Sequence, residues 1–166
     1  MSTMNFDLID IFVQVFNEMF SYIKLEHKFM CEVPASSMNS SEEFNTLVGV
    51  SGDLKGNIIF GYTKKTAHEV SSKIIGSKEK DDDALNYFEK AALSDFYSDF
   101  CKRVAERIKQ ENMYNFDEEV GSYTLLTSNP TYISGQKMYG IISKIPSKKL
   151  FFKVNGEKFG IAYSLE

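Results

Sequence analysis

Apolar residues near the beginning of the chain repeat at the spacing of an amphipathic helix. Between Phe6 and Ile23 they recur every three or four positions, which places them on one side of a helix. The stripe consists of Leu8, Phe12, Val15, Phe16, Met19 and Ile23, and Ile9, Val13 and Phe20 widen it. Such a broad apolar surface predicts a helix that is mostly buried.

Two β-rich runs separated by glycines predict a hairpin farther along the chain. The first run covers residues 47–50, and the second covers residues 57–62. Gly52 and Gly56 lie between them and permit a tight reversal of the chain. The stretch 34–41 before the hairpin is rich in serine and poor in large apolar residues, so we expect a loop there.

Two helices are predicted after the hairpin. The first covers residues 66–75, because Thr66 begins a capping-box pattern and Gly76 can end the helix in the left-handed conformation. An acidic, lysine-rich linker at 77–83 is expected to lie in solvent. The second helix is longer, and we expect it over 84–110.

The last part of the chain is predicted to form strands. We expect them at 120–126, 137–145, 150–154 and 158–163. Asn155 and Gly156, between the last two, are a strong signal for a tight hairpin turn. Because strands and helices do not alternate, the order indicates an α+β fold with a mostly antiparallel sheet packed against long helices. We expect a single domain over 1–166.

The long helix is predicted to have one apolar face and one polar face. Its core face consists of Leu85, Phe88, Ala92, Leu93, Phe96, Phe100 and Val104, with Tyr97 on the border. The opposite side consists of Ala91, Asp95, Ser98, Lys102 and Glu106, with Asp99 flanking it. Asp95 and Ser98 are three positions apart, so an acid and a hydroxyl can face one partner together. A polar face of this kind can also be only the solvated side of a surface helix.

Composition and charge exclude several classes of protein. With 166 residues, of which 43% are hydrophobic and 25% charged, the chain can form a globular core and is neither disordered nor disulfide-rich. A formal charge of -4 produces no general attraction for nucleic acid or anionic lipid. Asp10, Gln14 and Glu18 interrupt the first apolar stretch, so we expect neither a signal peptide nor a membrane span.

Cysteine and histidine residues do not suggest a metal site. Cys31, Cys101, His27 and His68 lack the spacing of metal ligands, so we expect no metal, no cofactor and a reducing cytoplasmic setting. We expect Cys101 to be partly buried and unreactive, and His68 to be a surface side chain. The sequence also lacks a glycine-rich phosphate loop, a nucleophile elbow and a zinc-protease motif.

Two segments resemble the CheC and CheX family of bacterial chemotaxis phosphatases. The stretch 48–59 (VGVSGDLKGNII) is similar to the family's strand, turn and strand, and a short helix follows it. The stretch 128–135 (SNPTYISG) is similar to the proline-containing segment that follows the family's long helix. The resemblance covers nearly the whole chain in order and spacing. Its single-copy arrangement is closer to CheX than to CheC, which has two motifs.

The resemblance implies a cytoplasmic homodimer that binds the phosphorylated receiver domain of a CheY-type response regulator and speeds the loss of its aspartyl phosphate. In the family, a glutamate on the long helix pairs with a receiver lysine. An asparagine three residues later orients the attacking water. The matching positions here are Asp95 and Ser98. The resemblance also implies that magnesium is held by the receiver and not by this protein.

Both matching positions differ from the family's motif. Asp95 keeps the charge but is one methylene shorter, and Ser98 can donate and accept hydrogen bonds but reaches less far than an amide. The family favours small residues just after the asparagine, whereas Asp99 and Lys102 occur here. We expect these two residues to contact the partner as well. Bulk and charge at these positions can obstruct the usual docking.

Two functions therefore stay open. The first is a CheX-like phosphatase with Asp95 and Ser98 as catalytic residues, and with Asp95, Ser98, Asp99 and Lys102 contacting the receiver. The second is a non-catalytic dimeric adaptor of the same fold, which binds a receiver or a flagellar switch component. A small-molecule pocket lined by phenylalanines is a further alternative, although phenylalanines at helical spacing more often fill a core.

Overall fold

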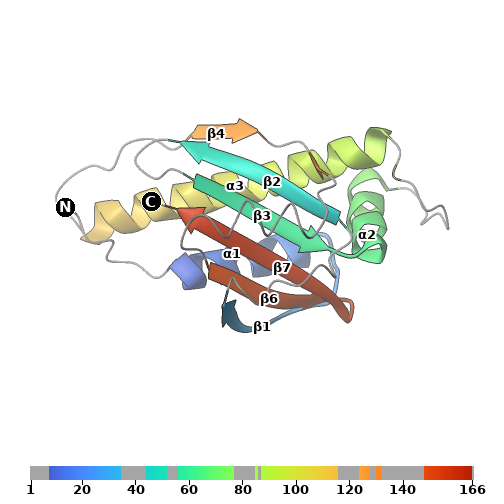
Figure 1. The fold of residues 1–166 in the computed structure, drawn as a ribbon, viewed down its shortest axis with the longest axis horizontal. Helices are drawn as coiled ribbons and strands as arrows, with labels where there is room; N and C mark the ends of the chain where they lie inside the picture. Colours follow the sequence, from blue (N-terminus) through green and yellow to red (C-terminus); the bar gives the residue numbers. More distant parts are fainter. Residues whose placement is uncertain are drawn as a thin grey trace.

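The computed structural model describes residues 8–34, 44–51, 56–76, 85, 87–115, 124–127, 130–131 and 148–165. Their elements form one seven-stranded sheet, with helices packed behind it (Figure 1). The strands are β1 (His27–Pro34), β2 (Phe44–Ser51), β3 (Gly56–Tyr62), β4 (Thr124–Thr127), β5 (Pro130–Thr131), β6 (Lys148–Val154) and β7 (Glu157–Leu165). The helices are α1 (Leu8–Tyr22), α2 (Lys64–Ile75) and α3 (Tyr87–Asn115).

The sheet has the strand order β1-β6-β7-β3-β2-β4, and the short β5 also pairs with β2. Every strand pair is antiparallel. The predicted α+β fold with an antiparallel sheet is therefore confirmed. The extent of a single domain over 1–166 stays a prediction.

The predicted turn at Asn155 and Gly156 and the predicted helix end at Gly76 are both present in the structure. Asn155 and Gly156 join β6 to β7 and have φ angles of 48° and 77°, as the turn between two paired strands requires. Gly76 ends α2 with a φ of 77°. The expected start of α2 at Thr66 is wrong. Thr63 is the N-cap, because its side-chain oxygen accepts a hydrogen bond from the backbone N–H of Thr66 at 3.2 Å.

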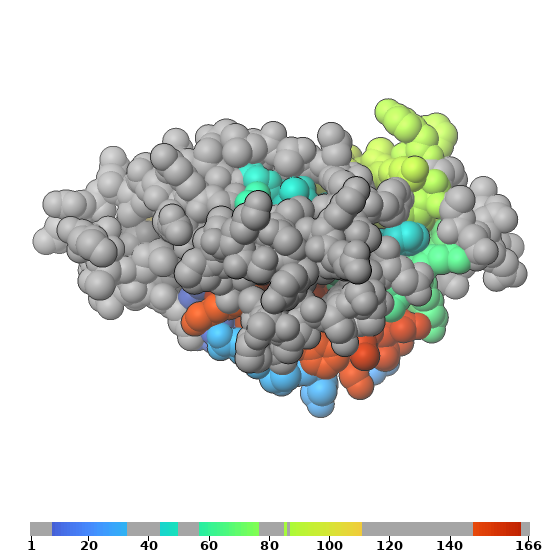
Figure 2. All heavy atoms as spheres, in the orientation of Figure 1, coloured from blue at the N-terminus to red at the C-terminus, as the bar shows by residue number. Residues whose placement is uncertain are grey.

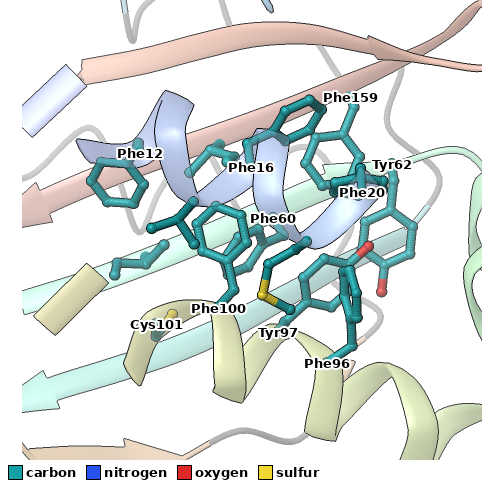
Figure 3. Packing of buried hydrophobic residues seen from close by; sticks show 14 of the residues in the cluster. Phe12, Phe16, Phe20, Phe60, Tyr62, Phe96, Tyr97, Phe100, Cys101 and Phe159 are labelled. Carbon is teal, nitrogen blue, oxygen red and sulfur yellow. The ribbon is translucent and has the colours of Figure 1, made fainter. Parts of the chain in front are cut away.

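Aromatic rings fill the space between α1, α3 and the sheet (Figure 3). Phe16 of α1 stacks on Phe152 of β6, with ring centroids 4.0 Å apart. Phe60 of β3 stacks on Tyr97 of α3 at 4.6 Å. Phe20 meets Phe96 of α3 edge to face at 5.5 Å. The helical residues Phe16, Phe20 and Phe96 are core residues, as their spacing indicates, and their packing positions α1 and α3 against the sheet.

Several local predictions are corrected by the structure. Strand β1 was not predicted, and Pro34, expected to begin a loop, is its last residue. Phe88 is 70% exposed and not in the core, whereas Tyr97 is fully buried and not on a border. The expected features at 35–41, 77–83 and 137–145, and the turn expected at 52–55, lie outside the described residues.

Candidate functional site

The four residues predicted to act together lie on the outer face of α3. The opposite face of the helix packs into the core, where Leu93, Tyr97 and Phe100 are completely buried. Asp95, Asp99 and Lys102 are exposed, and Ser98 is half-buried. The helical repeat therefore brings all four to one outward-facing stripe, centred near Asp95. Their functional role stays a prediction.

Asp99 differs from its neighbours because its side chain already forms an ion pair within the protein. Its carboxylate accepts a hydrogen bond from Arg103 Nε at 3.0 Å, one turn farther along the helix. Arg103 also lies 3.8 Å from the carboxylate of Glu18 on α1, and Arg107 bonds Gln14 and Glu18. These contacts tie α3 to α1. Asp99 therefore stabilises the helix pair, in addition to any contact that it makes with a partner.

The other three residues of the stripe, Asp95, Ser98 and Lys102, differ from Asp99 in their contacts. Within the described ranges, no hydrogen bond or ion pair of their side chains is present. Asp95 thus presents a carboxylate to solvent one turn away from the Ser98 hydroxyl. A carboxylate can accept hydrogen bonds from a cation, and a hydroxyl can both donate to and accept from a water molecule.

A second carboxylate on α3 is buried and was missed in the sequence. Glu89 Oε2 accepts a hydrogen bond from His68 Nδ1 at 3.0 Å and another from Ser71 Oγ at 3.4 Å. His68 and Ser71 belong to α2, so this cluster fastens α2 to α3. The prediction that His68 is a surface side chain is wrong, because only 7% of it is exposed. Helical spacing could have indicated that Glu89 is buried, because it lies four residues before the core residue Leu93 and hence on the same face of the helix.

The nucleophilic groups on the buried face of α3 are held in their neutral forms. Burial raises the pKa of Tyr97 well above its ordinary value, and the neighbouring Tyr62 raises it further. Burial likewise raises the pKa of the Cys101 thiol. Cys101 is fully buried, so the expected lack of reactivity has a physical basis. The groups of this helix that a partner can reach are those on the outer face.

In the described part of the chain, no group of three or more histidine, cysteine, aspartate or glutamate residues is arranged to hold a metal ion. None of the helices among the described residues has the length and apolar character needed to cross a membrane.

The fold of this chain also occurs in proteins of known structure. No family profile matches the sequence, and no curated protein matches it. Solved structures do match. The chemotaxis protein CheX from Desulfovibrio desulfuricans superposes with a TM-score of 0.69 at 16% identity, covering 97% of this chain and 100% of that one. The chain has the CheX fold.

Other proteins share the CheX fold with this chain. A CheX from Borrelia burgdorferi, solved in complex with CheY, BeF3 and magnesium, has a TM-score of 0.66 at 16% identity over 96% of this chain and 98% of that one. FliY from Thermotoga maritima has a TM-score of 0.61 at 11% identity over 93% and 84%. At these identities the likeness concerns the fold. The CheX fold extends over nearly the whole length of this chain and confirms the resemblance found in its sequence.

Proposed function

We propose that this chain is a cytoplasmic, homodimeric CheX-like chemotaxis protein that binds a phosphorylated CheY-type receiver and promotes its dephosphorylation. The CheX fold supports this proposal, and so does the Borrelia CheX solved with CheY. The observation that carries it is the outward placement of Asp95 and Ser98, one turn apart on α3, with no partner among the described residues.

In the proposed reaction, the carboxylate of Asp95 pairs with a lysine of the receiver and so fixes the position of α3. The Ser98 hydroxyl orients a water molecule in line with the aspartyl phosphate. The new bond forms between the water oxygen and phosphorus while the bond from phosphorus to the aspartate oxygen breaks. Inorganic phosphate leaves, and the receiver's carboxylate is restored. Positioning is the main contribution that this chain makes, because the receiver's own lysine and magnesium stabilise the charge.

A second function, a non-catalytic adaptor for a receiver or a flagellar switch component, is favoured by the geometry around Ser98. The short Ser98 side chain is half-buried, so its hydroxyl reaches less far from the helix than an amide would. Lys102 follows one turn later and is exposed, which crowds the approach of a partner. In this reading Asp95 still binds the receiver, but water is not held for attack.

Phosphate release separates the two functions. CheY-type receivers phosphorylated by acetyl phosphate are mixed with the unsubstituted protein and with Asp95→Ala, Ser98→Asn and the double variant Asp95→Glu/Ser98→Asn. We expect faster phosphate release with the unsubstituted protein than without it. We expect Asp95→Ala to abolish this gain, and the double variant to increase it by up to about a hundredfold through better water positioning.

Asp10→Ala serves as the matched control, because Asp10 is an exposed acid on α1 and not on the stripe. Receiver binding without accelerated phosphate release in any variant would favour the adaptor. If no CheY-type receiver binds, neither function of this site is correct.

A further inference from the structure

The start of α3 exposes two aromatic side chains. Tyr87 is 79% exposed and Phe88 is 70% exposed. Their rings meet edge to face, with centroids 5.8 Å apart. This part of α3, in yellow-green, stands out at one end of the molecule (Figure 2). Adjacent aromatic side chains that stay in water are a common feature of surfaces that bind other proteins.

Phe88 is continuous with the candidate site. It precedes Asp95 by seven residues, which is two helical turns, so the two side chains point within about 20° of one another around the helix axis. The rise between them is about 10 Å, a distance that one domain surface can span. Ala91 lies between them, is exposed, and presents only a methyl group. An apolar end and an acidic centre therefore share one exposed stripe of α3.

We infer that Phe88, with Tyr87 beside it, is an apolar anchor for the same CheY-type receiver that Asp95 meets. This inference rests on the proposed function. A carboxylate paired with a lysine orients a partner but is seldom the main source of affinity, whereas aromatic side chains buried on binding often are. The shortened acid at Asp95 and the serine at Ser98 make such an additional anchor more important here. The complementary surface on the receiver is apolar and lies about 10 Å from the lysine that pairs with Asp95.

The size of the aromatic pair favours a receiver over a second copy of this chain. Two rings exposed to this degree offer on the order of 300 Å² of surface. A standard stable interface buries about 800 Å² on each partner, so the pair is too small to hold a dimer by itself. Together with Asp95 and Ser98, it suits a transient signalling contact.

The inference is tested by measuring the affinity of a magnesium-bound, beryllofluoride-loaded CheY-type receiver for Phe88→Ala. We expect the Kd to rise by about tenfold or more, because removing an aromatic anchor typically has this effect. Phe88→Leu keeps an apolar group and is expected to recover part of the affinity. Tyr22→Ala is the matched control, since Tyr22 is 88% exposed at the end of α1, and its Kd is expected to stay within about twofold.

Each outcome distinguishes the anchor from the proposed function. If Phe88→Ala binds the receiver normally while Asp95→Ala does not, the anchor is overturned and the proposed function stands. If Phe88→Ala weakens binding and Asp95→Ala does not, the anchor is supported and the role of Asp95 fails. Light scattering on Phe88→Ala provides a further check. A change from dimer to monomer would identify a second copy as the occupant and overturn the inference. Both ideas fail if no such receiver binds the unsubstituted protein.

Discussion

Glu89 and Asp95 are two carboxylates on the same helix with opposite environments. Glu89 is buried and accepts hydrogen bonds from His68 and Ser71 of α2. Asp95 lies less than two turns later, is exposed, and has no partner among the described residues. A buried carboxylate must be satisfied by its own protein, whereas an exposed one stays available to another. Glu89 therefore joins α2 to α3, whereas the carboxylate of Asp95 faces solvent.

The largest expected difference between Glu89 and Asp95 is in how much their removal lowers the free energy of unfolding. Glu89→Ala leaves His68 buried without its acceptor and should lower the free energy of unfolding by about 2–4 kcal/mol. Asp95→Ala should change it by no more than about 0.5 kcal/mol, as is usual for exposed helix positions. Urea unfolding of both variants gives the comparison. Glu89→Gln, which keeps an acceptor, is the control with a smaller loss. Equal effects of the two alanine variants would refute the distinction.

An intermediate effect is expected from the cysteines at high pH. Burial raises the pKa of Cys101 above its ordinary value of 9.0, so above pH 9 the unfolded chain loses this proton first. Stability is then complete below pH 9 and falls above it, by about 1.4 kcal/mol at pH 10. Unfolding measured at pH 8 and pH 10 should show this fall. Cys101→Ala should remove most of this fall and leave the smaller part that the buried Tyr97 contributes, whereas Cys31→Ala, at an exposed position, should keep all of it. If the free energy of unfolding of Cys101→Ala falls as far between pH 8 and pH 10 as that of the unsubstituted protein, Cys101 is not the cause.

The smallest effect concerns Asp99, which lies between the two extremes because it is exposed and paired. Its ion pair with Arg103 spans one helical turn in solvent, so Asp99→Asn should lower the free energy of unfolding by about 0.3–0.5 kcal/mol. The loss should shrink at high salt. Asp95→Asn is the matched control and should cost less. A loss above about 1 kcal/mol would show that the Arg103 and Glu18 contacts act together as a network.

Local chemistry in the sequence predicts much of the fold. The repeat of apolar residues defines α1, and the turn residues Asn155 and Gly156 define the β6–β7 hairpin, because each signal depends only on neighbours in the chain. Strand β1 has no such signal. Lys28, Met30 and Glu32 are exposed along it. Among the described strands it pairs only with β6, so its conformation depends on a partner more than a hundred residues away.

In the candidate site, too, the sequence predicts features that depend on neighbouring residues and misses those that depend on distant ones. Helical spacing alone predicts that Asp95 and Ser98 share an outward face, and the structure places them there. The buried position of His68 could not be read from α2 by itself, because its acceptor Glu89 lies in another helix. Phe88 was assigned to the core face of the long helix by its helical spacing, and this assignment is wrong. Its exposure follows from its place on the helix, because Phe88 lies two turns before Asp95 and therefore on the same outward face of α3.

The position of β7 in the sheet has a consequence for biosynthesis. This strand lies between β6 and β3, near the middle of the sheet, although it is the last described strand to be made. While it is still inside the ribosome, β3 has no neighbour on that side and β1 has no β6 to pair with. The nascent chain therefore exposes strand edges and aromatic side chains that are buried in the folded protein. The sheet is expected to form only after β6 and β7 have left the ribosome, and a chaperone that shields the exposed strand edges is expected to help it form.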